Sequence, residues 1–194
     1  MTNERMQTPA DPATLQLVFL VSRERLGRRR LAQRTELSEM TVRLALDRLR
    51  NEGYLTIDKL GAILTELGRE RFSLVLHHVE RIREITLRSL AQDAVTLGAL
   101  LSLSAAKPSW WYRDHAIREG ASAMILIRCS VNGLYFSHSK EQIGAHNPQD
   151  EQVIKGAFPF RREGDLLVIV TASDRKSASL ALWRVIGEVL SETR

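Results

Sequence analysis

The segment SEMTVRLALDRLRNE, residues 38–52, carries the side chains whose types and spacing are best suited to chemistry in this 194-residue chain. Val42, Ala45, Leu46 and Leu49 recur at intervals of three and four, which predicts an amphipathic helix that packs on this side. The side chains left for the opposite side and the first turn are Glu39, Met40, Thr41, Arg43, Leu44 and Asp47. They form a mixed cationic, polar and apolar surface that can read an ordered array of donors, acceptors and methyl groups.

An exposed α-helix fits the major groove of B-DNA, where each base pair displays its own pattern of such groups. Arg43 would donate two hydrogen bonds to a guanine, and Met40 or Leu44 would contact a thymine methyl group. Arginines beside this helix would contact phosphates, which position a protein without reading the sequence. The residues predicted to contact DNA are Arg28, Arg29, Arg30, Ser38, Glu39, Met40, Thr41, Arg43, Leu44, Asp47, Arg48 and Lys59.

The net charge of +5 permits nucleic acid or any other anionic partner, and the distribution of the charge is more informative. Between Arg23 and Arg50 there are nine arginines and four acids, so this segment alone holds an excess of +5. Arginine is the side chain suited to forked contacts with phosphate. A solvated basic face without a ligand is the alternative interpretation.

The elements that would position these side chains follow from periodicity and from capping residues. Ser38 predicts the beginning of the helix and Gly53 its end. Residues 54–57 and 62–64 read as two short strands joined by a turn. Further helices are predicted at about residues 12–27, 28–34 and 65–71. Three helices, two short strands and a helix make the winged-helix layout.

The same segment resembles the helix-turn-helix of winged-helix transcriptional regulators over roughly residues 12–72. The matching positions are Leu31-Ala32, Thr35, Leu37-Ser38, Thr41-Val42-Arg43, Leu49, Gly53-Tyr54-Leu55 and Thr65-Glu66-Leu67-Gly68. Three positions depart from the pattern. Glu36 stands where the turn usually has glycine, and a left-handed conformation there would cost about 1 kcal/mol. Leu44 replaces a polar or basic residue, and Lys59 is the charge near the tip of the wing.

In the second half of the chain, predicted strands alternate with predicted helices. Helices are expected around residues 77–85, 108–120 and 175–192, strands at 94–104, 123–129, 134–137 and 164–172, and a polar loop at 140–151. Asn132-Gly133 is a strong two-residue hairpin turn. The alternation predicts a small α/β domain at residues 73–194 after a winged-helix domain at residues 1–72, whose first 11 residues are a lead-in. The predicted fold class is therefore α+β / α/β.

The stretch WWYRDHAIREGA, residues 110–121, is similar to a signature of archaeal winged-helix proteins with a C-terminal domain of unknown function. The matching residues are Arg113, Asp114, Ala116, Ile117, Arg118, Gly120 and Ala121, and the likeness continues over about residues 73–192. The resemblance implies the same two-domain plan but no particular ligand.

Two interpretations of this stretch remain open. Arg113 and Asp114 can form a structural pair, with the three aromatic residues in the core or at a dimer contact. Alternatively, the charged residues lie beside a pocket with an aromatic wall, and the beginning of the last helix offers backbone N–H groups to an anion. The residues of that ligand site would be Trp110, Trp111, Tyr112, Arg113, Asp114, Arg118 and Ser173.

Other chemistry finds little support in the sequence. His77-His78, and the pair His138 and His146, match no ligand template, so no metal and no cofactor are predicted. Asp114 and His115 are the one candidate acid–base pair, and neighbours on a helix point about 100° apart. We therefore expect no enzyme.

The expected function is a DNA-binding transcriptional regulator whose C-terminal domain senses a small effector, dimerises, or does both. Two reading helices about 34 Å apart would address successive major-groove faces, which favours a homodimer on double-stranded DNA. The alternative is an enzyme, or a ligand-free interaction protein, that uses the winged helix to dock other proteins. The chain shows no signal peptide, no membrane-spanning run and one cysteine, Cys129, so a cytoplasmic location without membrane contact is expected.

Overall fold

The computed structural model describes residues 11–104, 107–137, 139–159 and 162–192. Residues 1–10, most of the expected lead-in, lie outside the described residues. Contacts within the chain divide it into two compact units, one spanning Ala10–His77 and the other beginning at His78. Each unit is considered by itself below. Among the described residues, no helix combines the length and the apolar character needed to cross a membrane.

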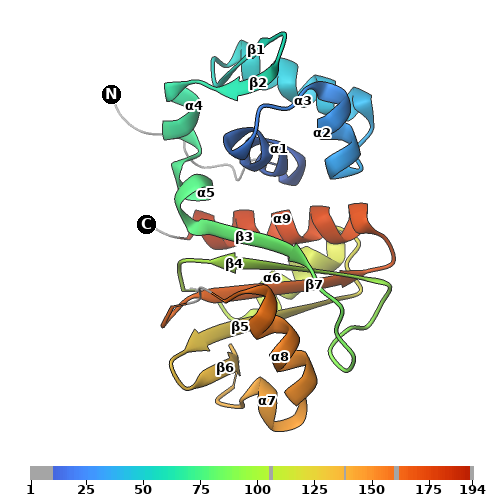
Figure 1. Ribbon diagram of the computed structural model, residues 1–194, viewed down its shortest axis with the longest axis vertical. Coiled ribbons are helices and arrows are strands. Elements are labelled where there is room, and N and C mark those ends of the chain that lie inside the picture. The colour runs from blue at the N-terminus through green and yellow to red at the C-terminus, as the bar shows by residue number, and fades with distance from the viewer. Residues whose placement is uncertain (1–10, 105–106, 138, 160–161, 193–194) are drawn as a thin grey trace. The chain divides into compact units, whose positions relative to one another are not determined.

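The first unit follows the predicted order of three helices, a hairpin and a helix (Figure 1). Its elements are α1 (Pro12–Arg23), α2 (Arg28–Thr35), α3 (Glu39–Asn51), β1 (Leu55–Asp58), β2 (Gly61–Leu64), α4 (Glu66–Arg71) and α5 (Ser73–His78). β1 pairs with β2 antiparallel, and Asp58 lies opposite Gly61 across a two-residue turn. Buried leucines and valines of α1, α2 and α3 meet at the centre of the unit. α1 ends at Arg23, earlier than expected.

The turn between α2 and α3 adopts the conformation expected at Glu36. This residue has φ 57° and ψ 18°, in the left-handed region, and it is the one described non-glycine residue with a positive φ. Leu37 is buried just after it, and Ser38 then caps α3. The left-handed residue reverses the chain so that both helices bury their apolar sides together, and this burial offsets the local strain.

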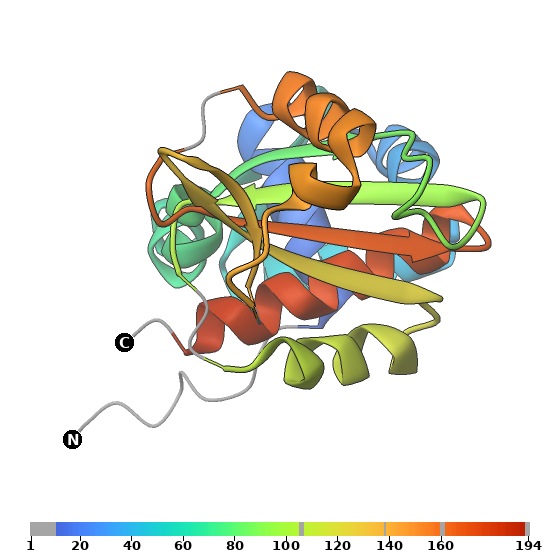
Figure 2. The ribbon, with the colours of Figure 1, turned by 90° about the horizontal axis from the view of Figure 1, so that it is seen from below.

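The second unit is a five-stranded sheet with helices on both faces. Its elements are β3 (Val79–Glu84), β4 (Val95–Leu101), α6 (Ser109–Arg118), β5 (Ala123–Ser130), β6 (Gly133–Phe136), α7 (Ile143–His146), α8 (Pro148–Ala157), β7 (Leu166–Ala172) and α9 (Arg175–Ser191). The strand order is β3-β4-β7-β5-β6, and every pairing is antiparallel. α6 and α9 cover one face and α8 lies on the other (Figure 2). The predicted fold class is confirmed.

Two local predictions in this unit were wrong. The segment expected as a charged helix at 77–85 becomes strand β3 after His78, because Val79 to Glu84 pair with β4. The polar loop expected at 140–151 holds α7 and the first turn of α8. Ile143, Ile154 and Phe158 are fully buried there against the sheet, so tertiary burial stabilises helices that show little local periodicity.

Asp150 joins α8 to the loop between β3 and β4. Its carboxylate is almost fully buried and accepts three backbone N–H bonds, from Arg88 at 2.7 Å, Ser89 at 2.8 Å and Leu90 at 2.9 Å. The neighbouring side chains Leu87 and Leu90 pack on the apolar cluster beneath α8. Asp150 is therefore the polar anchor of the loop that covers this face of the sheet.

Candidate functional site

α3 presents two chemically different sides. Its first turn is capped by Ser38, whose hydroxyl oxygen accepts the Thr41 N–H at 3.0 Å. Val42, Leu46 and Leu49 are buried against the rest of the unit, and Ala45 is half-buried. The predicted reading side is exposed, with Met40 at 59% and Leu44 at 62% of their full accessible surface. Glu39, Thr41 and Arg43 are also exposed, and Asp47 is half-buried.

Exposed ion pairs line the same side of α3. Asp47 lies between two arginines, with Arg43 Nε 3.6 Å from Oδ2 and Arg50 Nη2 3.4 Å from Oδ1. Arg28 Nε lies 3.6 Å from Glu39 Oε2, which places the first residue of α2 beside the beginning of α3. These pairs are solvent-exposed and contribute little to stability. Their arginines are therefore available to exchange an internal carboxylate for an external anion.

Arg48 lies further along α3 and points to Glu52, with Nε 3.1 Å from Oε1. The hydrogen bond to Glu52, followed by its negative charge, raises the pKa of Arg48 above the ordinary value. The guanidinium remains protonated at any pH at which the protein is folded, as guanidinium groups do. Arg48 therefore supplies a permanent positive charge at the edge of the reading side.

The N-terminus of α2 contributes a further anion-binding feature. Gly27 caps this helix without a side chain, so the first-turn N–H groups receive no side-chain hydrogen bond there. Arg28, Arg29 and Arg30 occupy that turn, and all three are exposed. A small cavity of about 150 Å³ separates this turn from α3 and the wing, and Arg28, Arg43, Asp47 and Ile57 are among its lining residues. Positive helix ends flanked by arginine suit phosphate.

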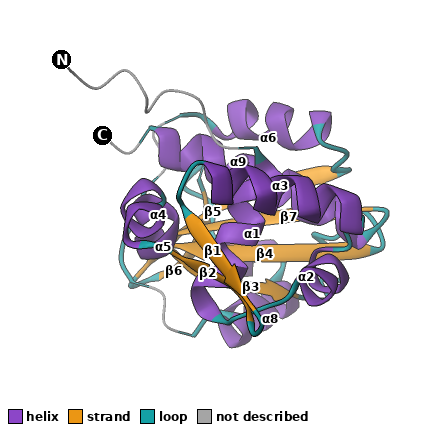
Figure 3. Cartoon of the chain, turned by 90° about the horizontal axis from the view of Figure 1, so that it is seen from above, coloured by secondary structure: helices purple, strands orange, loops and turns teal. Residues whose placement is uncertain are grey.

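The β1–β2 hairpin, the predicted wing, is short, and the contacts of Asp58 hold its turn. Asp58 accepts the N–H groups of Leu60 at 2.8 Å and Gly61 at 3.1 Å, and it pairs with Arg25 Nη1 at 3.2 Å. These contacts leave Lys59 and Leu60 exposed at the tip. Figure 3 shows the β1–β2 hairpin in the same unit as α3, which contacts β1. The wing therefore offers one cation and one apolar side chain to a partner.

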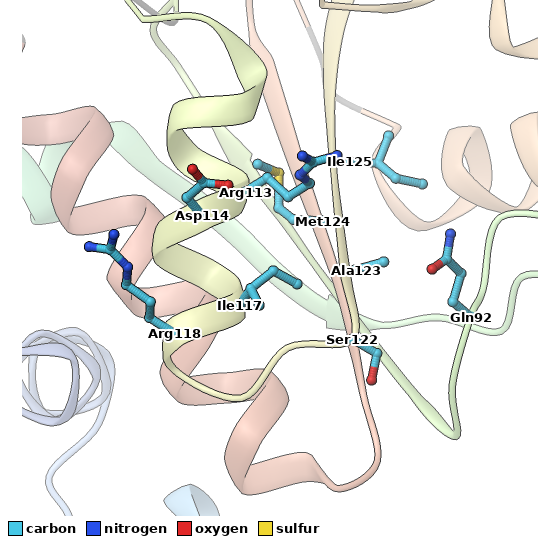
Figure 4. A pocket seen from close by; sticks show the side chains of 9 residues that line it. All are labelled: Gln92, Arg113, Asp114, Ile117, Arg118, Ser122, Ala123, Met124 and Ile125. Carbon is cyan, nitrogen blue, oxygen red and sulfur yellow. The ribbon is translucent and has the colours of Figure 1, made fainter.

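The second unit contains an open cavity of about 610 Å³ between α6 and the beginning of β5 (Figure 4). It is lined by Gln92, Arg113, Asp114, Ile117, Arg118, Ser122, Ala123, Met124 and Ile125. Arg113 lies on the side of α6 that faces Met124 and Ile125, whereas Asp114 and Arg118 lie on the other side of the helix (Figure 4). The structure thus brings the three predicted charged residues to one cavity but does not point them at one spot.

The two interpretations of residues 110–118 are both modified by the structure. Among the described residues, no ion pair includes Arg113, Asp114 or Arg118, so the proposed local Arg113–Asp114 pair is absent. Tyr112 is fully buried, and its hydroxyl donates to Glu192 Oε2 at 2.6 Å and accepts the Lys107 N–H at 3.1 Å. It belongs to the core and is not a pocket wall.

The remaining predicted ligand residues do not line the cavity either. Trp110 and Trp111 are exposed and contact each other edge to face, with ring centroids 6.1 Å apart. Ser173 lies at the beginning of α9, where Asp174 accepts the Ser177 N–H at 2.9 Å. This bond, followed by the Ser177 hydroxyl, lowers the pKa of Asp174, so a carboxylate already occupies that helix end. An anion is therefore excluded from the position predicted for it.

Sequence reasoning missed the residues that β5 and the preceding loop supply to the cavity. Ser122 donates its hydroxyl hydrogen to Asp93, and this bond, with the N–H of Ala94, lowers the pKa of the Asp93 carboxyl. The sequence around Gln92, Ser122 and Met124 has no local pattern that predicts a binding site. Their proximity to α6 arises because β5 pairs with β7 beneath that helix.

In the described part of the chain, the histidines and acids named above as candidates do not form one site. His115 lies toward Glu188, with Nδ1 3.7 Å from Oε1, and does not form a pair with Asp114. His146 Nε2 lies 3.2 Å from Glu141 Oε1, and His138 is outside the described residues. Over the part of the chain that the structure describes, no three or more metal-ligating side chains gather in one place.

Two comparisons with known proteins find a match, one to part of the second unit and one to nearly the whole chain. Residues 104–189 match the family described as Domain of unknown function (DUF4443). A hypothetical protein from Pyrococcus horikoshii OT3 has a similar structure, with a TM-score of 0.75 and 21% sequence identity over 94% of this chain and 93% of that one. No curated protein matches. The expectation of an uncharacterised C-terminal domain is confirmed, and the structural likeness shows the fold alone.

Proposed function

We propose that this protein is a DNA-binding transcriptional regulator and that α3 enters the major groove. The supporting observation is the exposure of Met40, Arg43 and Leu44 opposite a seam in which Val42, Leu46 and Leu49 are buried. A helix with this division fits the groove while its unit stays folded. Arg43 would read guanine, and the first-turn arginines of α2, with Arg48 and Lys59, would hold phosphates on either side.

Regulation would come from the second unit. It would dimerise, bind a small effector in the cavity beside α6, or do both. A dimer would place two reading helices on successive major-groove faces. An effector that binds one arrangement of the dimer more tightly would shift the population toward it and thereby change the affinity for DNA.

A protein-docking role is the second candidate, because apolar side chains share the proposed interface with the arginines. Met40, Leu44 and Leu60 are all more than half exposed, which also suits an apolar surface of another protein. The two candidates differ in their dependence on salt. Because counterions are released when arginines bind phosphates, the affinity for DNA falls steeply as the salt concentration rises. The affinity of an apolar docking contact changes little.

The first prediction is a steep salt dependence of duplex binding, measured by fluorescence anisotropy with the full chain. Each phosphate neutralised contributes a slope of about −0.9 in log K against log salt, so Arg28, Arg29, Arg30, Arg48 and Lys59 together give about −4.5. The double variant Arg29→Ala/Arg30→Ala should reduce the magnitude of the slope by about 2. Arg83→Ala, an exposed arginine of β3, is the matched control and should leave the slope unchanged. A slope near zero would favour protein docking and overturn the proposal.

The second prediction concerns base reading by Arg43. On the duplex that is enriched from a random pool, Arg43→Ala should weaken binding by about 10- to 100-fold, because a forked contact to guanine is lost. On random duplex the same variant should bind nearly as the wild type does. If the affinity of the variant falls equally for both duplexes, Arg43 is a phosphate contact and the proposed orientation of α3 is wrong.

A further inference from the structure

One acidic side chain, Asp47, lies among the arginines on the exposed side of α3. Two of them share its carboxylate, with Arg43 Nε 3.6 Å from Oδ2 and Arg50 Nη2 3.4 Å from Oδ1. Arg43 precedes Asp47 by four residues and Arg50 follows it by three, so the three side chains are neighbours on the helix surface. Asp47 thus holds a negative charge between two arginines on the surface that would face DNA.

A carboxylate in this place is unfavourable for contact with a nucleic acid. The phosphates of the duplex repel it, and guanine and thymine present hydrogen-bond acceptors in the major groove, which repel it as well. The ion pair with Arg43 adds little to the stability of the helix, because the two side chains are 58% and 39% exposed. The stability of α3 therefore does not account for Asp47, and its effect on the neighbouring arginines is the feature that matters for binding.

The ion pair of Asp47 with Arg43 is made through Nε of the guanidinium. A guanidinium has five N–H donors in one plane, of which Nε carries one and the two terminal nitrogens carry four. The two terminal nitrogens are sufficient for a forked contact to O6 and N7 of guanine. Asp47 can therefore hold Arg43 without competing with the base that Arg43 would read.

We infer that Asp47 is a positioning residue, which holds Arg43 in the orientation that reads guanine and weakens the attraction of Arg43 and Arg50 to phosphates. This inference rests on the proposed function of α3. A long side chain loses rotamer freedom when it is immobilised on binding, and a restraint that exists before binding reduces this loss. When the helix enters the groove, water is displaced and the ion pair strengthens. The carboxylate thereby favours a sequence that Arg43 can read over one that it cannot.

The variant Asp47→Asn keeps the shape of the side chain and removes its charge. Arg43 and Arg50 then become free to contact phosphates, so binding to random duplex should tighten, and the slope of log K against log salt should become steeper by about 1 to 2. The preference for the duplex enriched from a random pool over random duplex should fall about fivefold, because Arg43 is no longer restrained. Fluorescence anisotropy with the full chain measures both quantities.

The matched control is Glu52→Gln. Glu52 also pairs with an arginine four residues away on α3, with Arg48 Nε 3.1 Å from Oε1, but Arg48 is a proposed phosphate contact and not a base contact. The control variant removes the same charge from the same helix, so it should tighten binding to both duplexes by a similar factor and leave the preference unchanged. If the preference falls as much in Glu52→Gln as in Asp47→Asn, the loss of charge alone is the cause, and the inference is overturned.

A double-mutant cycle tests whether Asp47 acts through Arg43. In the background of Arg43→Ala, which removes the proposed guanine contact, Asp47→Asn should leave the preference between the two duplexes unchanged. An equal fall of the preference in both backgrounds would mean that Asp47 contacts a base itself, such as the amino group of cytosine, and would overturn the inference. Circular dichroism checks that each variant is folded.

The behaviour of the wild type separates this inference from the function on which it rests. A wild-type chain that does not prefer the enriched duplex over random duplex overturns the proposed function, and the inference fails with it. If the wild type prefers the enriched duplex and Asp47→Asn keeps the full preference, the inference alone is overturned and the proposed function of α3 stands.

Discussion

Replacement of Asp150 by alanine should lower the free energy of unfolding of the second unit by about 4 kcal/mol, as expected for the loss of several charge-assisted hydrogen bonds at a buried site. The carboxylate accepts the N–H groups of Arg88, Ser89 and Leu90 within 2.9 Å, and the side chain is 1% exposed. Alanine leaves three backbone donors without their acceptor beside a position that is almost fully buried. The cost of such unpaired donors exceeds the modest net gain of forming the bonds.

Chemical denaturation of the full chain, followed by a signal of the second unit such as Trp183 fluorescence, provides the measurement. Trp183 is buried in α9. Asp93→Ala is the matched control, because Asp93 also accepts a backbone N–H, from Ala94, but is exposed. Its loss should change the free energy of unfolding much less. Equal effects of the two variants would mean that burial of Asp150 is not the cause.

The loop held by Asp150 continues to the cavity of α6, since Gln92 lines it and Asp93 accepts a hydrogen bond from Ser122. Weakening of this anchor should therefore also disturb the cavity beside α6, although Asp150 itself lies on the other face of the sheet. Faster amide hydrogen exchange of Ser122 in Asp150→Ala, measured where the variant is still folded, would report this connection between the core and the cavity.

Gly68→Ala should destabilise the first unit by about 4 kcal/mol or more, in the range reserved for severe backbone conflicts. A Cβ at this position would lie 1.9 Å from the carbonyl oxygen of Tyr54 and 2.8 Å from its carbonyl carbon. The same Tyr54 oxygen accepts the N–H of Thr65, at 3.0 Å, so it is fixed between the end of α3 and the beginning of α4. Backbone atoms on both sides cannot move apart without breaking that junction.

The expected readouts are separate for the two units. Far-ultraviolet circular dichroism during thermal unfolding should show a lower transition for the first unit, and duplex binding should be lost at temperatures where the wild type binds. Gly156→Ala is the control, because an added Cβ in α8 meets no atom within 4 Å. Alanine is favoured over glycine inside a helix, so this variant should be neutral or stabilising by up to about 1 kcal/mol. A Gly68→Ala protein as stable as the wild type would contradict the close packing of α4 on Tyr54.

The two units differ in how much of the candidate site their sequence predicted. In the first unit, the buried seam of α3 and its exposed side are set by intervals of three and four within 13 residues of helix, and the left-handed turn is marked by the position of Glu36. In the second unit, the same stretch of sequence predicted that Arg113, Asp114 and Arg118 line a cavity, but it also placed Tyr112 there, which is buried. Helical periodicity alone does not tell which side of α6 meets the sheet.

The sequence by itself determined the features that depend on neighbours along the chain. These are the order of the helices and the hairpin in the first unit, the cap at Ser38, the hairpin at Asn132-Gly133 and the apolar strands that form the middle of the sheet. Each reflects backbone geometry or the burial of a local apolar pattern, and both act within a few residues.

The tertiary structure alone decided the features that need a distant partner. Residues 79–84 are rich in good helix formers and become a strand because β4 offers its edge. The carboxylate of Asp174 fills the helix end expected to hold an anion. In each case the free energy of a long-range contact exceeds the local preference. The pattern of neighbouring residues therefore does not predict the result.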